Sequence, residues 1–145
     1  MIQARLLPVQ LIAGGRGVII PAGAFAQMGL FDEEQLPHYW ADHDFYLAAR
    51  KRGIPLYVAT QAFVDVDSTR TTTADRPEQL IFPEFLDTLT STRSHRNLRD
   101  VTALFRKHFP VPHLHMVGVF LYLSRYTMVY LARRSGHRIR RFLRD

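Results

Sequence analysis

The chain has 145 residues, which is enough for one globular domain with a buried core. Its apolar content of 47% is ordinary for a folded protein and argues against disorder. The absence of cysteine excludes disulfides, thiolate metal sites and a cysteine nucleophile, and it fits a reducing compartment. The first residues are too polar for a signal peptide.

Charge is distributed unevenly along the chain, whose formal net charge is +6. Residues 1–92 carry 7 basic and 11 acidic groups, whereas residues 93–145 carry 12 basic and 2 acidic groups. A neutral-to-acidic part followed by a basic tail predicts binding to an anionic surface. Nucleic acid and anionic lipid both qualify on charge alone.

The elements predicted first are short. Residues 1–13 are apolar without a clear period, and residues 14–17 predict a glycine-rich turn. This turn either binds a phosphate or brings the backbone close to a neighbouring segment. The β-branched run 18–20 predicts a buried strand, and a helix over 22–28 should begin after a proline and end at a glycine. Residues 30–31 are expected to pack under the sheet.

The central prediction is a helix from Asp42 to about Arg52. Acidic residues stand at its start, basic residues at its end and Gly53 just beyond, the order that the helix dipole and the C-cap favour. At that position Asp42 can be simply an N-cap, whose carboxylate accepts free backbone N–H groups. A catalytic role for Asp42 is the alternative.

Two further strands are expected over 54–59 and 62–67. In the second, Asp65 and Asp67 alternate with valines and therefore share one face, where a pair of carboxylates can bind a divalent cation. An edge strand with its polar face in water explains the same pattern. The polar segment 68–75 is either a lid over a site or a linker.

The last part of the sequence is predicted to be helical. Amphipathic segments lie at 81–89 and 101–108, and the most apolar run is 114–132. That run is near the lower length limit for a membrane span, but Arg125 counts against one. Its broad apolar face and basic end predict an interfacial membrane helix; packing on the protein's own core, on a partner or in a dimer is the alternative. A narrow polar stripe is expected at His115, Gly118, Tyr122 and Arg125.

Three motifs, in this order and spacing, resemble one known family. They are Gly14-Gly-Arg-Gly-x-x-Ile-Pro21, Phe25-x-x-x-Gly-Leu-Phe-Asp-Glu33 and Ala41-Asp-His-Asp-Phe-x-x-x-x-Arg50. Together they resemble the acceptor-side half of family 2 glycosyltransferases with the GT-A fold. The resemblance covers about residues 14–67, over a third of the chain.

The resemblance implies a catalytic residue. Asp42 would be the general base that takes the proton from an acceptor hydroxyl as this hydroxyl attacks the anomeric carbon. Asp44 would orient the loop or contact the acceptor. His43 is expected to turn out of the site.

The resemblance also implies substrate-binding residues. The small residues Gly15 and Gly17 would leave room for the donor and acceptor sugars, and Arg16 would face a phosphate or an acidic acceptor. Tyr39 and Trp40 would offer flat apolar faces to a sugar ring.

Many family members place a metal-binding histidine where this chain has Asp67. The resemblance therefore implies that Asp67 is the ligand of a divalent cation, Mg or Mn, or that the contact is less important here. A nucleotide-binding half ending in an Asp-x-Asp motif precedes this region in the family, so the chain is interpreted as a truncated, C-terminal part of such an enzyme.

The expected fold class is α/β. Residues 1–76 would form part of a GT-A (Rossmann-like) domain with short strands, and residues 77–145 a helical, basic extension that associates with membranes. A partial sheet exposes an edge, which predicts dimerisation or aggregation.

The expected function is inverting transfer of a sugar from a nucleotide-sugar donor to a glycan or lipid-linked acceptor, as in polysaccharide biosynthesis. The chain would then be cytoplasmic and peripheral to the inner face of the membrane, on an anionic surface. A non-catalytic membrane-associated interaction domain is the alternative. A nucleic-acid-binding module is less favoured, because the apolar run is too long for a groove-reading helix and no recognition motif is present.

Overall fold

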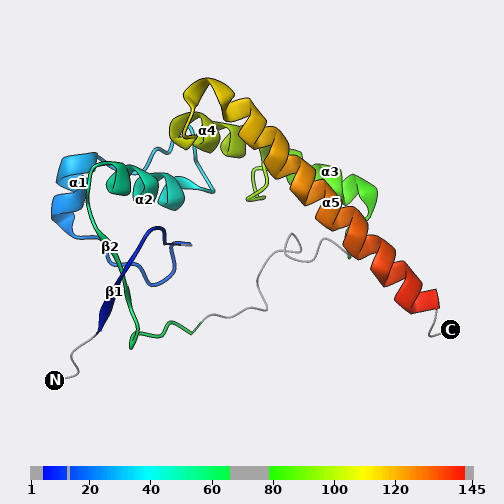
Figure 1. Cartoon of the computed structure of the whole chain (residues 1–145), viewed down its shortest axis with the longest axis horizontal. Helices are drawn as coiled ribbons and strands as arrows, with labels where there is room; N and C mark the ends of the chain where they lie inside the picture. Colours follow the sequence, from blue (N-terminus) through cyan, green and yellow to red (C-terminus); the bar gives the residue numbers. More distant parts are fainter. Residues whose placement is uncertain (1–4, 13, 66–78, 143–145) are drawn as a thin grey trace. The chain divides into compact units, whose positions relative to one another are not determined.

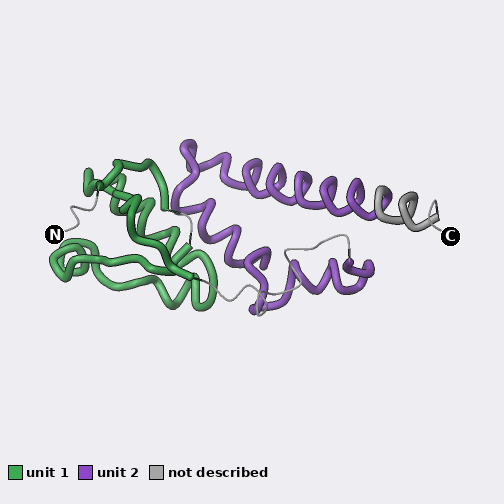
Figure 2. Tube along the Cα trace, turned by 90° about the horizontal axis from the view of Figure 1, so that it is seen from below, with its two compact units in different colours: residues 1–66 green, residues 67–145 purple. Residues whose placement is uncertain are grey.

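The computed structural model describes residues 5–12, 14–65 and 79–142, with the side chains of the last helix described as far as residue 135. The chain divides into two compact units, residues 1–66 and 67–145 (Figure 2). The described residues contain both helices and a sheet, which confirms the mixed α/β class. The domain boundary predicted after residue 76 lies outside the described residues.

The sheet of the first unit is a two-stranded antiparallel ribbon. Strand β1 (Leu6–Val9) pairs with β2 (Leu56–Ala59), with Leu6 opposite Ala59. The prediction located β2 but not β1, whose Pro8 interrupts any strand pattern and is tolerated because the strand is an edge.

Two predicted strands are wrong within the described residues. Residues 18–20 are not a strand, and the Ile19 side chain is 93% exposed. Residues 62–65 are also irregular and exposed, although their alternating pattern resembles that of a strand. β-branched residues favour a strand only where a neighbouring strand or a core receives them, and neither segment has either.

Helix α1 (Ala22–Met28) begins after a proline and ends at a glycine with positive φ, as predicted. Its Phe25 ring lies 5.2 Å from the ring of Phe45 and 5.9 Å from that of Phe31. Three aromatic rings therefore join α1 to the next helix. Leu30 does not pack under the sheet as predicted, since its side chain is 82% exposed.

Helix α2 (Ala41–Lys51) has nearly the predicted bounds (Figure 1). Its end is closed by Gly53, which has φ 76° and donates its N–H to the carbonyl of Arg50. Tyr46 and Ala49 are buried on its inner face, and they form the core of the first unit together with Leu36.

The regular elements in the described part of the second unit are helices, and the three α-helices were predicted, whereas the short 3-10 helix at residues 112–114, where two prolines were expected only to break the helix, was not. The helices are α3 (Phe82–Thr90), α4 (Leu98–His108), the short 3-10 helix η4 (Pro112–Leu114) and α5 (His115–Phe142). Helix α5 continues ten residues beyond its predicted end.

The core of the second unit is a stack of aromatic rings. The Phe85 ring of α3 stacks on Tyr130 at 4.2 Å and on Tyr126 at 5.0 Å, both from α5. The Thr88 hydroxyl lies 2.9 Å from the Tyr126 hydroxyl, and the Arg96 guanidinium lies 4.0 Å from the Tyr126 ring centre. The tyrosines can be buried because both their rings and their hydroxyls have partners.

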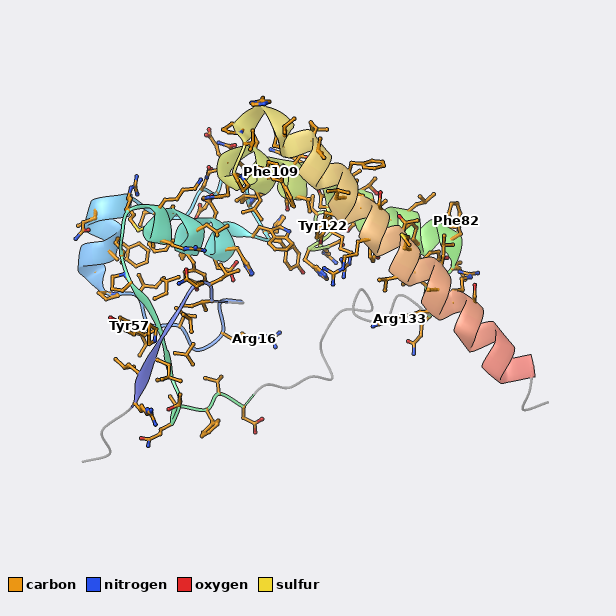
Figure 3. The ribbon with its side chains drawn as sticks, in the orientation of Figure 1. Arg16, Tyr57, Phe82, Phe109, Tyr122 and Arg133 are labelled. Carbon is orange, nitrogen blue, oxygen red and sulfur yellow. The ribbon has the colours of Figure 1, made fainter. Side chains whose placement is uncertain are left out.

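The predicted polar stripe of α5 is partly wrong. Gly118 is buried, and Tyr122 is half-buried with its hydroxyl accepting a hydrogen bond from Arg96 at 3.3 Å (Figure 3). These two residues therefore lie on the face that packs on the protein's own core. The tyrosines line that core face, and a different face of α5 remains in solvent.

The α4–α5 contact depends on the absence of a side chain at Gly118. A Cβ placed there would lie 2.4 Å from a ring carbon of Phe109 and 2.5 Å from one of Phe105.

We expect Gly118→Ala to lower the free energy of unfolding by about 1–3 kcal/mol, because two rings must move. Urea denaturation followed by circular dichroism measures this. Gly23→Ala, at a helical glycine with no atom within 4 Å, should cause no loss. Equal stability of both variants would contradict the close packing.

Candidate functional site

The glycine-rich turn lies against the start of α2. A Cβ placed on Gly15 would lie 3.2 Å from Oδ2 of Asp42, which is tighter than ordinary contact. Gly17 has φ 70°, and a Cβ there would lie 2.3 Å from Cγ2 of Val64. The structure therefore brings together two motifs that are 27 positions apart in the sequence through Gly15, whereas Gly17 allows the turn to approach Val64.

The two oxygens of the Asp42 carboxylate have different surroundings. Oδ1 accepts a hydrogen bond from the His43 backbone N–H at 2.8 Å and lies 3.0 Å from Nδ1 of the His43 ring. Oδ2 faces Gly15, and the side chain remains 29% exposed. The carboxylate stands in the first turn of α2, where the helix dipole favours a negative charge.

The N-cap position itself is occupied by Trp40 rather than Asp42. Oδ1 of Asp42 still accepts a hydrogen bond from the backbone N–H of His43 in the first turn, as the side chain of a capping residue would. The structural and the catalytic interpretation are therefore compatible, since they use different oxygens of one carboxylate.

Trp40 has an unusual backbone. With φ 70°, it is the one residue other than glycine with positive φ in the described part of the chain. Its ring meets the His43 ring edge-on, with centroids 5.0 Å apart. A bulky residue in this region is strained, and such strain occurs most often at functional sites. Tyr39, the preceding residue, is half-buried.

His43 contributes to the site, although the sequence predicted that it turns away. Its ring contacts both the Asp42 carboxylate and the Trp40 ring. The contact between His43 and Asp42 could not be predicted from helical spacing, because adjacent residues do not normally face each other on a helix. The contact forms because Asp42 folds back over the first free N–H groups of α2.

The other predicted site residues have different environments. Asp44 is only 7% exposed, so its burial favours the loop-orienting role over direct contact with an acceptor. Arg16 is exposed on the glycine turn (Figure 3). Asp67, the predicted metal ligand, lies outside the described residues, and no group of three His, Cys, Asp or Glu side chains that could hold a metal occurs among those that are described.

Tyr46 follows Asp42 by one helical turn and is buried. Burial raises the pKa of the Tyr46 phenol above its ordinary value, and the negative charge of Asp42 raises this pKa further. The folded protein therefore holds this proton more tightly than the unfolded chain does. The stability that this proton contributes is complete below about pH 10, the ordinary pKa of tyrosine, and is lost as the pH rises above it.

We accordingly expect the free energy of unfolding to fall less steeply with alkaline pH in Tyr46→Phe than in the unchanged protein. Denaturant titrations between about pH 8 and pH 11 measure the two slopes. Tyr57→Phe, which removes the same hydroxyl from an exposed position of β2, is the matched control. Identical slopes in Tyr46→Phe and the unchanged protein would contradict the burial of the Tyr46 phenol.

Comparisons with protein-family models, with curated proteins and with solved structures found no match to this chain.

Proposed function

We propose that the chain is the acceptor-side part of an inverting glycosyltransferase with a GT-A, Rossmann-like domain, and that Asp42 is its general base. The observation that supports this most directly is the approach of Gly15 to Oδ2 of Asp42. Because Gly15 has no side chain, the space beside Oδ2 of this partly exposed carboxylate is free. An acceptor hydroxyl needs such a space in order to reach the carboxylate.

The proposed reaction is a single displacement. The acceptor oxygen forms a bond to the anomeric carbon of the donor sugar, and the bond from that carbon to the nucleotide diphosphate breaks. The proton of the acceptor hydroxyl passes to Oδ2 of Asp42, and attack opposite the leaving group inverts the configuration. A base acts only within hydrogen-bond reach of its proton, about 2.6–3.2 Å, so the orientation of the carboxylate matters.

His43 would position the base. Its backbone N–H and its ring both engage Oδ1, which fixes the rotation of the carboxylate and directs Oδ2 toward Gly15. The half-buried rings of Tyr39 and Trp40 would contact a sugar ring, and exposed Arg16 would meet a phosphate or an acidic acceptor. A divalent cation, Mg or Mn, would neutralise charge on the leaving diphosphate.

The single tryptophan provides a test on the chain itself. Because Trp40 is the only tryptophan in the sequence, its fluorescence reports on this site alone. We expect glycan acceptors to change that fluorescence in the unchanged protein. In Gly15→Ala the new methyl group displaces Oδ2, so we expect acceptor binding to weaken by about tenfold or more, the loss caused by roughly 1.4 kcal/mol.

Gly23→Ala is the control for this test, since it is the same substitution in open space. Acceptor binding that is equal in Gly15→Ala, in Gly23→Ala and in the unchanged protein would count against an acceptor site at the glycine turn. Circular dichroism establishes that both variants remain folded.

A further inference from the structure

One face of α5 is apolar and in solvent. Between residues 116 and 131, six large hydrophobic side chains are between 48% and 69% exposed. At 100° per residue they fall within an arc of about 140°, and the core residues Val119, Tyr126 and Tyr130 lie outside it. We call these six residues the outer face of α5: Met116, Val117, Phe120, Leu121, Met128 and Leu131.

The same helix is strongly basic. It carries six arginines and no carboxylate, and five of the arginines stand in its last ten residues. The sixth, Arg125, lies at the border of the outer face and is exposed. Arg133 is also exposed (Figure 3). An apolar surface of this kind therefore runs along a helix with a high positive charge at one end.

We infer that α5 binds the surface of an anionic lipid bilayer, lying in the plane of the interface with its outer face among the acyl chains. No helix in the described part of the chain is long and apolar enough to cross a bilayer. Interfacial helices combine an apolar face with arginines that attract anionic headgroups, and the two contributions add. This inference does not depend on the proposed transferase activity.

Two other occupants fit less well. A second copy of the chain would bring two helices with six arginines each into contact without a carboxylate on either, and like charges oppose that association. The phosphates of a nucleic acid would pair with the arginines. They offer no apolar surface, however, so the outer face of α5 would remain in water. A bilayer accommodates both features at once.

Co-sedimentation with vesicles tests the inference. The full chain should bind vesicles of phosphatidylcholine and phosphatidylglycerol much more strongly than vesicles of phosphatidylcholine alone, and high salt should weaken this binding. The Phe120→Asp, Met128→Asp double variant should bind at least about tenfold more weakly, and Arg125→Gln about fivefold more weakly. Leu30→Asp is the control, since Leu30 is an even more exposed hydrophobic residue in the other unit.

A depth measurement separates insertion from adsorption. The chain has no cysteine, so Leu121→Cys carries a single spin label on the outer face of α5. With anionic vesicles the label should become inaccessible to a water-soluble relaxing agent, whereas a label at Leu30→Cys should stay accessible. Three results would overturn the inference: equal binding of the Asp double variant, a label protected without vesicles in a dimer, or DNA binding with no binding to anionic vesicles.

Discussion

Asp42→Asn should lower the rate of sugar transfer by about 10²–10⁴-fold, the usual contribution of a general base. Asparagine keeps an oxygen that can accept from the His43 N–H, so the start of α2 should stay intact. Only the proton acceptor at Oδ2 is lost. The assay uses the chain joined to a nucleotide-binding half of the GT-A fold, because the resemblance assigns donor binding to a half that precedes these motifs.

The control for this substitution is Asp87→Asn, at an exposed position of α3 in the second unit. It should transfer sugar at the unchanged rate. Donor binding, measured by calorimetry, should be equal in both variants. Full activity of Asp42→Asn would leave Asp42 with its capping role alone, and loss of donor binding together with activity would point to misfolding of the site.

Phe85→Ala should lower the free energy of unfolding of the second unit by about 3–5 kcal/mol. The Phe85 ring is buried and stacks on two tyrosines of α5, so its removal leaves a cavity between α3 and α5. Because the single tryptophan lies in the first unit, urea denaturation followed by the helical circular dichroism signal is the suitable measurement.

Phe82→Ala removes the same ring from the same helix at a position that is 58% exposed (Figure 3). It should cost no more than about 1 kcal/mol, since little apolar surface is lost from the core. Similar losses in the two variants would show that the aromatic stack does not hold the second unit together.

Local signals explain which elements were predictable. Helices α1 and α2 have a proline or acidic residues at one end and a glycine at the other, and both have the expected bounds. The amphipathic pattern of α4 was equally clear. Strand β1 and the irregular run 18–20 were not predictable in this way, because a strand depends on a partner distant in the sequence.

The site was predictable only in part. The resemblance grouped the glycine turn with Asp42, and the structure places Gly15 against that carboxylate. Whether Asp42 is a base remains a prediction. The His43 contact and the left-handed backbone of Trp40 depend on how the chain enters α2, and residue types alone do not encode that entry angle. The polar stripe of α5 was partly wrong because a tyrosine such as Tyr122 is apolar enough for a core and polar enough for a stripe.

The left-handed backbone of Trp40 has an energetic cost that a glycine at the same position would not have. A left-handed conformation costs a bulky residue about 1–2 kcal/mol, and glycine would adopt it without that cost. The backbone energy alone would therefore favour glycine there. Glycine would, however, lose the contact between the Trp40 ring and the His43 ring. Under the proposed function, residue 40 is thus a position where a less strained backbone and an aromatic surface for a sugar ring require different residues.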